Sequence, residues 1–306
     1  MIPDLEFGKS GLRMRPLGLG TSRWAPGPAG VEGARAALAA TLAAGVTFVD
    51  TAEIYGKGAS ERILGGLIGE GPRPFVATKF APLPYRFRAS ALPKALDRSL
   101  ARLGTDAVDL YQIHWPYSLI RIEALMARLA DAVAAGKVRH VGVSNYSAAQ
   151  MRAAHAALAK RGVALASNQV HYSLLRRNPE RNGVLAACRE LGVTLIAYRP
   201  IAGGALTGKY GPGRETVTGL RRFRGQFRKL ERTWPLVQEL ERIGAAYGRT
   251  GSQVALNWLA RQPGVMPIPG ARNGAQATEN VGSIDFAITD DEAARLSAHS
   301  DRITKG

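Results

Sequence analysis

Ionisable residues stand where three successive apolar stretches of the chain end. Asp50 follows the apolar residues of VTFVD, Lys79 those of FVATK and His114 those of LYQIH. A buried charge without a partner is costly, so we expect these side chains to face one another. Tyr55 comes shortly after Asp50, in DTAEIYG, and can reach the same place.

These four residue types together can transfer a proton to a carbonyl oxygen. A tyrosine with an ordinary pKa of about 10 is a poor acid–base group near neutrality, but an adjacent ammonium favours the phenolate and lowers that pKa. Lys79 can supply this ammonium, Asp50 can hold it, and His114 can orient a substrate oxygen. Each residue alone also has a structural explanation, but the combination favours an active site.

The elements that must position these residues follow one repeated pattern, in which a short apolar stretch alternates with an amphipathic segment. We predict strands at 15–22, 46–52, 74–80, 107–115, 138–146, 164–172, 193–200 and 265–271. We predict helices at 31–44, 59–69, 91–103, 122–135, 147–161, 182–191 and 236–247. Glycines follow many of these helices, as expected for C-caps, and Ser147 is placed to be an N-cap. Eight strands alternating with helices predict an α/β fold, a closed (β/α)8 TIM barrel whose active site lies at the C-terminal ends of the strands.

The alternative, an open doubly wound sheet, would require G-x-G-x-x-G at the first strand-to-helix turn. Here Gly18-Leu19-Gly20 is followed by Thr21, Ser22 and Arg23, so the third glycine is missing. A short N-terminal β-hairpin is expected to turn at Gly8–Gly11. The longest connection, 201–232 after the seventh strand, is interpreted as a loop, so residues 1–306 are predicted to form a single domain.

The motifs around these residues resemble those of the aldo-keto reductase family over nearly the whole chain. They are DTAEIYG, TKF, the IHWP stretch, GVSNY (142–146), ASNQVHYS (166–173), IAYRPIAGGALTGKY (196–210) and IPGARNGAQATEN (268–280). The long loop and QVALNWL (253–259) are similar to the branch that includes bacterial and plastid reductases and the potassium-channel β subunits. The resemblance implies a barrel with Asp50, Tyr55, Lys79 and His114 as its catalytic tetrad.

The resemblance also implies an NADP-dependent oxidoreductase, which uses NADPH to reduce an aldehyde or ketone to an alcohol. In this reaction Tyr55 would be the general acid, tuned by Lys79 and Asp50. The implied cofactor-binding residues are Gly20, Thr21, Ser22, Asp50, Ser144, Asn145, Gln169, Tyr198, Arg199, Pro200, Ile201, Gly203, Gly204, Leu206, Lys209, Gly270, Ala271, Arg272, Gln276, Glu279 and Asn280. Among them Tyr198 would stack on the nicotinamide, and Arg272 would favour NADPH over NADH by pairing the 2′-phosphate. Arg199 departs from the small hydroxyl residue common in this branch.

Trp24, Tyr55, Trp115 and Tyr85 are the candidate substrate contacts, because they lie on loops at the predicted mouth of the barrel. The expected partner is a small carbonyl compound. An alternative is a regulatory module that binds NADPH with little turnover, as the resemblance to channel subunits suggests. A purified protein that retains its cofactor without turnover would favour that alternative.

The composition leaves a charge of +17 to explain, with 32 Arg and 9 Lys against 24 acidic residues. Most arginines are scattered, but a basic cluster lies within 214–232, a candidate for a loop near an anion. Nucleic-acid binding there is disfavoured because only Phe223 and Phe227 interleave with the charges. No paired Cys or His-rich motif suggests a metal, and the single Cys188 reads as a buried, inert thiol. The sequence shows no signal peptide and no apolar segment of membrane-spanning length. The protein is therefore expected to be soluble and cytoplasmic and not to bind a membrane.

Overall fold

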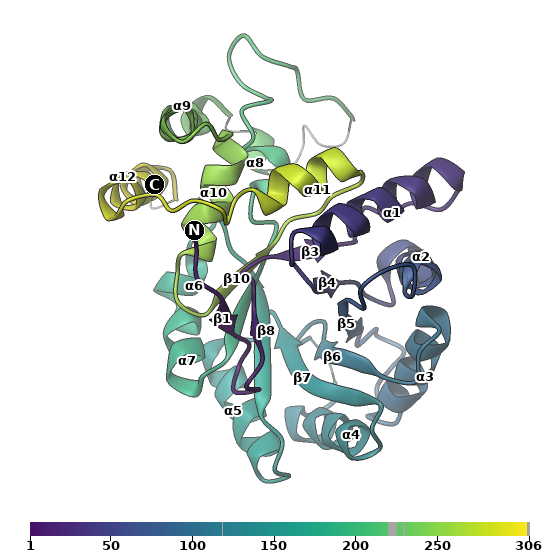
Figure 1. Ribbon diagram of the computed structural model, residues 1–306. Helices are drawn as coiled ribbons and strands as arrows, with labels where there is room; N and C mark the ends of the chain where they lie inside the picture. Colours follow the sequence, from purple (N-terminus) through teal and green to yellow (C-terminus); the bar gives the residue numbers. More distant parts are fainter. Residues whose placement is uncertain (118, 220–224, 229, 305–306) are drawn as a thin grey trace.

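A computed structural model describes residues 1–117, 119–219, 225–228 and 230–304 of the chain. Eight parallel strands follow one another in sequence order around a barrel, with helices outside them (Figure 1). The strands are β3 (Gly18–Gly20), β4 (Phe48–Asp50), β5 (Phe75–Phe80), β6 (Val108–Ile113), β7 (Val138–Ser144), β8 (Leu165–His171), β9 (Thr194–Tyr198) and β10 (Val265–Ile268). The amide of Gly20 donates to the carbonyl of Pro269 at 2.9 Å and closes the barrel between its first and last strands. The predicted (β/α)8 fold is therefore confirmed.

The helices between the strands cover the barrel because each presents an apolar face to it. In α3 the buried positions recur every three or four residues, from Leu92 to Leu103, as expected for an amphipathic helix. The helices are α1 (Pro28–Ala43), α2 (Ala59–Leu67), α3 (Ala91–Leu103), α4 (Ile122–Ala134), α5 (Ala148–Ala159), α6 (Asn178–Arg181), α7 (Val184–Leu191), α8 (Gly225–Arg228), α9 (Leu230–Ala246), α10 (Gly251–Ala260), α11 (Gly274–Val281) and α12 (Asp290–Thr304). Ser147 caps α5 in a reciprocal box with Gln150, as predicted.

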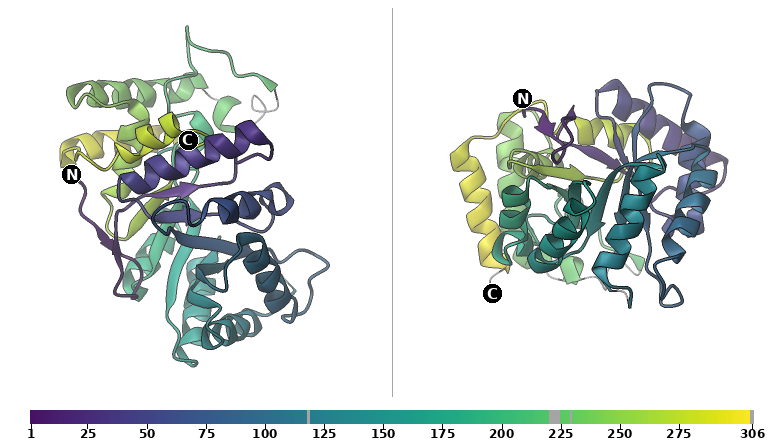
Figure 2. Two further views of the ribbon diagram at one scale, coloured as in Figure 1. Left: turned by 45° about the vertical axis from the view of Figure 1, so that its right-hand side comes forward. Right: turned by 90° about the horizontal axis from the view of Figure 1, so that it is seen from below.

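An N-terminal hairpin covers the amino end of the barrel; it lies at the upper edge of the right-hand view in Figure 2. Its strands β1 (Leu5–Glu6) and β2 (Arg13–Met14) pair antiparallel. The ring of Phe7 lies 5.3 Å from that of Phe75, inside the lower layer of the barrel. The amide of Gly8 donates to the hydroxyl of Thr194 at 2.8 Å, which ties the hairpin to the start of β9. The predicted hairpin is therefore present, and it covers the amino end of the barrel interior.

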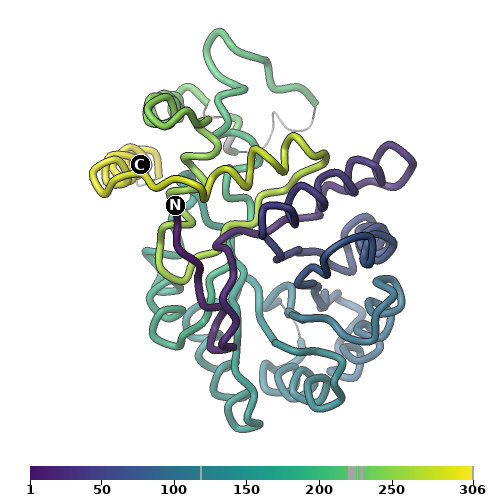
Figure 3. The backbone as a smooth tube through the Cα atoms, in the orientation of Figure 1, coloured from purple at the N-terminus to yellow at the C-terminus, as the bar shows by residue number. Residues whose placement is uncertain are grey.

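Three longer helices lie outside the predicted set, namely α10, α11 and α12. Every residue of α10 is buried and none is charged, so its sequence lacks the charged face by which an amphipathic helix is recognised. Residues 205–219, after β9, extend away from the barrel (Figure 3). Four members of the predicted basic cluster, Arg221, Arg222, Arg224 and Lys229, lie outside the described residues. Within the described ranges, no helix combines the length and apolarity that crossing a membrane requires.

Candidate active site

The four predicted catalytic residues meet at the carboxyl end of the barrel because parallel register aligns the ends of their strands. Asp50 ends β4 and Lys79 lies near the end of β5. The amide of His114, just after β6, donates to the carbonyl of Phe80 at 2.8 Å. Tyr55 begins the 3-10 helix η1 (Tyr55–Gly58) on the loop after β4.

The ammonium of Lys79 is the centre of this cluster. Its Nζ donates to both carboxylate oxygens of Asp50, at 2.7 and 2.6 Å, and to the carbonyl of Thr51 at 2.7 Å. It also lies 3.4 Å from the hydroxyl of Tyr55. Burial opposes the charge on Lys79, but Asp50 and Tyr55 outweigh it and raise the pKa of the amine. Lys79 is therefore a fully buried cation next to the phenol.

The pKa of Tyr55 differs from the sequence-based expectation. The expectation was a lowered value, because Lys79 favours the phenolate. Burial of the phenol is the larger influence and raises the pKa, the Lys79 ammonium lowers it, and the charge of Asp50 adds to the rise. The predicted direction is wrong because burial of the phenol outweighs the effect of the Lys79 ammonium, which the charge of Asp50 also opposes. Tyr55 is thus fully protonated at neutral pH, which is the form that can donate a proton.

His114 is a neutral imidazole at the same mouth. Burial, together with the charge of Lys79, lowers the pKa of His114 to about 2. Its ring lies 5.9 Å from that of Tyr55 and stacks on Trp115 at 4.0 Å. Its Nδ1 is buried and has no hydrogen-bond partner among the described residues. A neutral imidazole carries one N–H group and can therefore donate a hydrogen bond to a substrate oxygen.

Two amides extend the cluster across the barrel. Gln169 on β8 donates through Nε2 to Oδ1 of Asp50 at 2.7 Å, and Gln112 on β6 approaches the same oxygen at 3.5 Å. Gln169 was predicted as a cofactor contact, whereas Gln112 was missed. Gln112 precedes His114 by two residues in YQIHW, so the alternation of a strand could have placed it on the inner face. The carboxylate of Asp50 is therefore held from three strands.

A second polar group lies at the ends of β7, β8 and β9. The Tyr198 hydroxyl donates to Oδ1 of Asn145 at 3.0 Å, while the Asn145 amide donates to the carbonyl of His114 at 3.2 Å. Ser144 donates through Oγ to the carbonyl of Gln169 at 2.8 Å. These contacts join the predicted nicotinamide-binding residues to one another and to the tetrad.

His171, which is not among the predicted site residues, packs against this group through Tyr198. Its ring stacks on Tyr198, with the centroids 5.2 Å apart and the planes 20° apart. Burial and the nearby charges of Arg176 and Arg199 lower the pKa of His171 to about 4, so this ring is also neutral at pH 7. The position of His171 two residues after Gln169 on one strand was the available signal.

The loop after β9 carries the predicted pyrophosphate contacts. Arg199 and Ala202 adopt left-handed backbone angles, as do Gly203 and Gly204 in the 3-10 helix η2 (Ala202–Gly204). The guanidinium of Arg199 is exposed and has no ion pair within the described chain. Lys209, by contrast, pairs with Glu215 at 3.2 Å. The remaining predicted residues of this loop differ in exposure: Pro200 and Leu206 are buried and Ile201 is half-buried.

The loop after β10 leads into α11. The amide of Arg272 donates to Oε1 of Gln276 at 3.0 Å, while its exposed guanidinium has no partner within the described residues. Asn280 is buried, and its amide lies 3.4 Å from the carbonyl of Gly270. Glu279 accepts from the hydroxyl of Thr250 at 2.9 Å. Arg272 precedes α11 and Gln276 lies in its first turn, whereas Glu279 and Asn280 lie in its last turn. Ala271, before the helix, is buried.

The three candidates after β3 lie beside this closure. Gly20 pairs with Gly270, and Ser22 is exposed. Thr21 is buried, and its hydroxyl bonds to the carbonyl of Asp50 at 3.0 Å and to Ser60 Oγ at 2.6 Å. The hydroxyl of Thr21 thus bonds to the segment that carries Asp50 and Tyr55.

Comparison with known proteins agrees with this arrangement. The model of the Aldo/keto reductase family matches residues 16–301. The chain belongs to this family. It is 36% identical to the chloroplastic pyridoxal reductase of Arabidopsis thaliana over 93% of this chain and 83% of that protein. It is 34% identical to the aldo-keto reductase yakc of Schizosaccharomyces pombe, named for NADP(+), over 94% of this chain and 86% of that protein. The crystal structure of a Klebsiella pneumoniae aldo-keto reductase in complex with NADPH superposes with a TM-score of 0.79 at 29% identity, covering 99% of this chain and 95% of that one.

The predicted substrate contacts of this aldo/keto reductase family member occupy different places. Trp115 stacks on His114 and belongs to the mouth. Trp24 is buried, and its indole nitrogen donates to the carbonyl of Ala271 at 2.9 Å. Tyr85 is 69% exposed. It lines a surface cavity of about 200 Å3 together with Arg86, Phe87, Arg88 and Lys94. The structure therefore places Trp115 beside the tetrad, to which Tyr55 itself belongs. Trp24 and Tyr85 lie elsewhere on the loops.

Proposed function

We propose that the protein reduces an aldehyde or ketone to an alcohol with NADPH, using Tyr55 as the proton donor. The observation that carries this proposal is the completely buried Lys79 ammonium, bonded to Asp50 and in reach of the Tyr55 hydroxyl. Membership of the aldo/keto reductase family supports it, as does the likeness to a reductase solved with NADPH.

The residues present fit a phosphorylated dinucleotide. Arg199 and Arg272 are exposed cations without partners within the described residues, on the loops after β9 and β10. Arg86 and Arg102, by contrast, pair with Glu53 and Glu61. Phosphates at these loops would satisfy both guanidinium groups. Tyr198 is half-buried with its hydroxyl fixed by Asn145, so it offers a ring face to the nicotinamide.

The chemistry then follows from the protonation states of the protein groups. Bound NADPH would supply the hydride that reduces the carbonyl carbon. Tyr55 donates its proton to the carbonyl oxygen, and the Lys79 ammonium stabilises the phenolate that forms. Neutral His114 donates a hydrogen bond to the same oxygen and orients it. Asp50 and the Thr51 carbonyl hold Lys79 in place, so the positive charge does not have to reorganise during the step.

Turnover with NADPH tests the proposal directly. Purified protein should consume NADPH with members of a panel of aldehydes, ketones and keto-sugars, in which we include pyridoxal because of the similar plant enzyme. Tyr55→Phe should lower kcat by about 100- to 10,000-fold and leave the Kd for NADPH within about twofold, because it removes only the proton donor. NADPH binding without turnover on any carbonyl would contradict the proposed reaction. That result would favour the regulatory module.

A further inference from the structure

A buried ion pair joins the loop that carries Tyr55 to the loop that follows β5. Glu53 precedes Tyr55 by two residues, and its side chain is 6% exposed, while that of Arg86 is 10% exposed. Oε2 of Glu53 accepts from Nη2 of Arg86 at 2.9 Å, and Oε1 accepts from Nη1. The pair is thus bidentate, which fixes the relative orientation of the two side chains.

The same two side chains also hold the main chain just beyond Lys79. Oε1 of Glu53 accepts from the amide of Ala81 at 2.7 Å, and Nη1 of Arg86 donates to the carbonyl of Ala81 at 2.8 Å. Ala81 follows Lys79 by two residues. Glu53 and Arg86, which we call the Glu53–Arg86 clamp, therefore join the segment that carries the phenol to the segment that carries the ammonium.

The phenol itself has few polar contacts that fix its position. Tyr55 lies in a single 3-10 turn in which Gly56 and Lys57 both adopt left-handed backbone angles. The only hydrogen bond of the Tyr55 hydroxyl within the described residues is the one to Lys79, at 3.4 Å. A contact of that length does not fix the position of a side chain by itself. The position of the hydroxyl therefore depends on the ring contact with His114, at 5.9 Å, and on the way the loop is held.

The burial of Glu53 and Arg86 also indicates a role beyond stability. Removing two charges from water is expensive, and a well-packed apolar pair at the same place is often as stable or more so. Asp109, near the start of β6, shows the cheaper arrangement, since it accepts from the amide of Val76 at 2.8 Å and pairs with two half-exposed arginines. A buried clamp beside the phenol is therefore unexplained by stability alone.

We propose that Glu53 and Arg86 are positioning residues for the proton-transfer step, which set the distance between the Tyr55 hydroxyl and the Lys79 ammonium. The role rests on the proposed carbonyl reduction for its kinetic consequence. A displaced phenol would meet the carbonyl oxygen less often in the productive geometry. Misplacement of a reacting group by about 1 Å can cost about 100-fold in rate.

The kinetic test compares Glu53→Gln, Arg86→Met and the double variant with Asp109→Asn as the matched control. Each clamp variant should lower kcat about 10- to 100-fold and leave the Kd for NADPH within about twofold. The double variant removes both charges, so it should recover the unfolding midpoint but not kcat. Recovery of kcat together with stability would overturn the proposal, because the clamp would then be a stability device. Asp109→Asn should leave kcat within about twofold.

A second readout does not depend on turnover. The ultraviolet titration of Tyr55 is obtained by comparing each variant with the same variant carrying Tyr55→Phe. In the parent protein this phenol should ionise above its ordinary pKa of about 10, because it is buried. In the clamp variants the midpoint should fall toward about 10 as water reaches the displaced phenol, whereas Asp109→Asn should not move it. An unchanged titration and an unchanged kcat would refute the clamp alone, whereas a parent protein without turnover would refute only the reaction.

Discussion

The two ends of the barrel each hold a buried carboxylate that pairs with cations, but the cations differ in their access to water. At the carboxyl end, the side chains of Asp50 and Lys79 are 3% and 0% exposed. At the amino end, Asp109 pairs with Arg73 and Arg139, whose side chains remain about half exposed. The arginines keep most of their hydration, so this arrangement costs little. The buried pair is expensive, and such pairs are concentrated at functional sites.

The backbone shows the same contrast. The αβ loops at the amino end use glycine where the backbone is left-handed, at Gly45, Gly104, Gly136, Gly162 and Gly192. Among the residues that the structure describes at the carboxyl end, four that are not glycine adopt such angles, namely Lys57, Asn145, Arg199 and Ala202. Each non-glycine residue there costs about 1 to 2 kcal/mol. The end that carries the chemistry is the end at which strain is tolerated.

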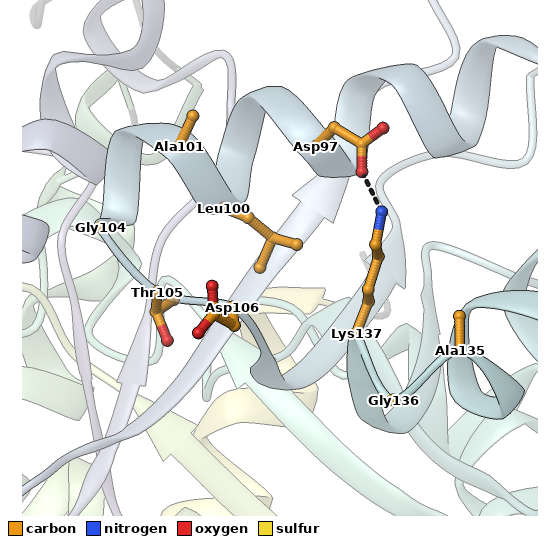
Figure 4. A pocket seen from close by; sticks show the side chains of 9 residues that line it. All are labelled: Asp97, Leu100, Ala101, Gly104, Thr105, Asp106, Ala135, Gly136 and Lys137. Carbon is orange, nitrogen blue, oxygen red and sulfur yellow. Dashed lines mark hydrogen bonds and ion pairs between the residues drawn. The ribbon is translucent and has the colours of Figure 1, made fainter.

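The amino end of the barrel also has a surface cavity. A pocket of about 610 Å3 lies at the amino end, between the ends of α3 and α4 (Figure 4). Across it, Lys137 donates to Asp97 at 2.7 Å, and both side chains are about half exposed. Groups that stay in water keep their ordinary chemistry, so concavity without burial does not make a catalytic site.

The largest effect should come from Lys79. Lys79→Met leaves Asp50 buried without its cation, and it should lower kcat about 100- to 10,000-fold and destabilise the protein by about 3 to 5 kcal/mol. The double variant K79M/D50N removes both charges and should recover most of the free energy of unfolding but none of the activity. Urea unfolding and NADPH consumption measure the two quantities. If the double variant regained activity, the buried pair would have no chemical role, and the contrast between the two ends would disappear.

Much of this contrast was predictable from the sequence because strand ends are local features. An apolar stretch ending in Asp, Lys or His marks both the strand and the place where its side chain emerges, and parallel strands bring such ends together. The fold and the meeting of Asp50, Lys79 and His114 follow from that rule.

The remaining features depend on contacts between distant segments. The pKa of Tyr55 results from a balance between burial, Lys79 and Asp50, and a sequence does not state how deeply a loop is buried. Glu53 and Arg86 lie 33 residues apart on loops without periodic patterning, so nothing in the sequence pairs them. The helix α10 was missed for a related reason. All of its residues are buried and none is charged, so no charged face marks it as a helix.

An intermediate effect is expected at Arg272. Arg272→Gln should raise the Kd for NADPH about tenfold and leave the Kd for NADH within about twofold, since only NADPH has the 2′-phosphate that a guanidinium could pair. Fluorescence titration of the purified protein measures both constants. Arg98→Gln, at an exposed position on α3, removes the same charge away from the mouth and should change neither. An equal effect of the two variants would mean that net charge, rather than a phosphate contact, attracts the cofactor.

The smallest effects compare the backbones of the two ends. Gly104→Ala places a side chain at a φ of 62° with nothing within 4 Å to obstruct it, so backbone strain alone should lower the free energy of unfolding by about 1 kcal/mol. Lys57→Gly makes the reverse change at the carboxyl end, at a φ of 55° on an exposed residue. It should raise the free energy of unfolding by about 0.5 kcal/mol, because relief of strain exceeds the extra entropy that glycine loses on folding. Urea unfolding of both variants gives the signs. If Lys57→Gly instead destabilised the protein as much as Gly104→Ala does, the loop of Tyr55 would not be strained, and only the buried charges would separate the two ends of the barrel.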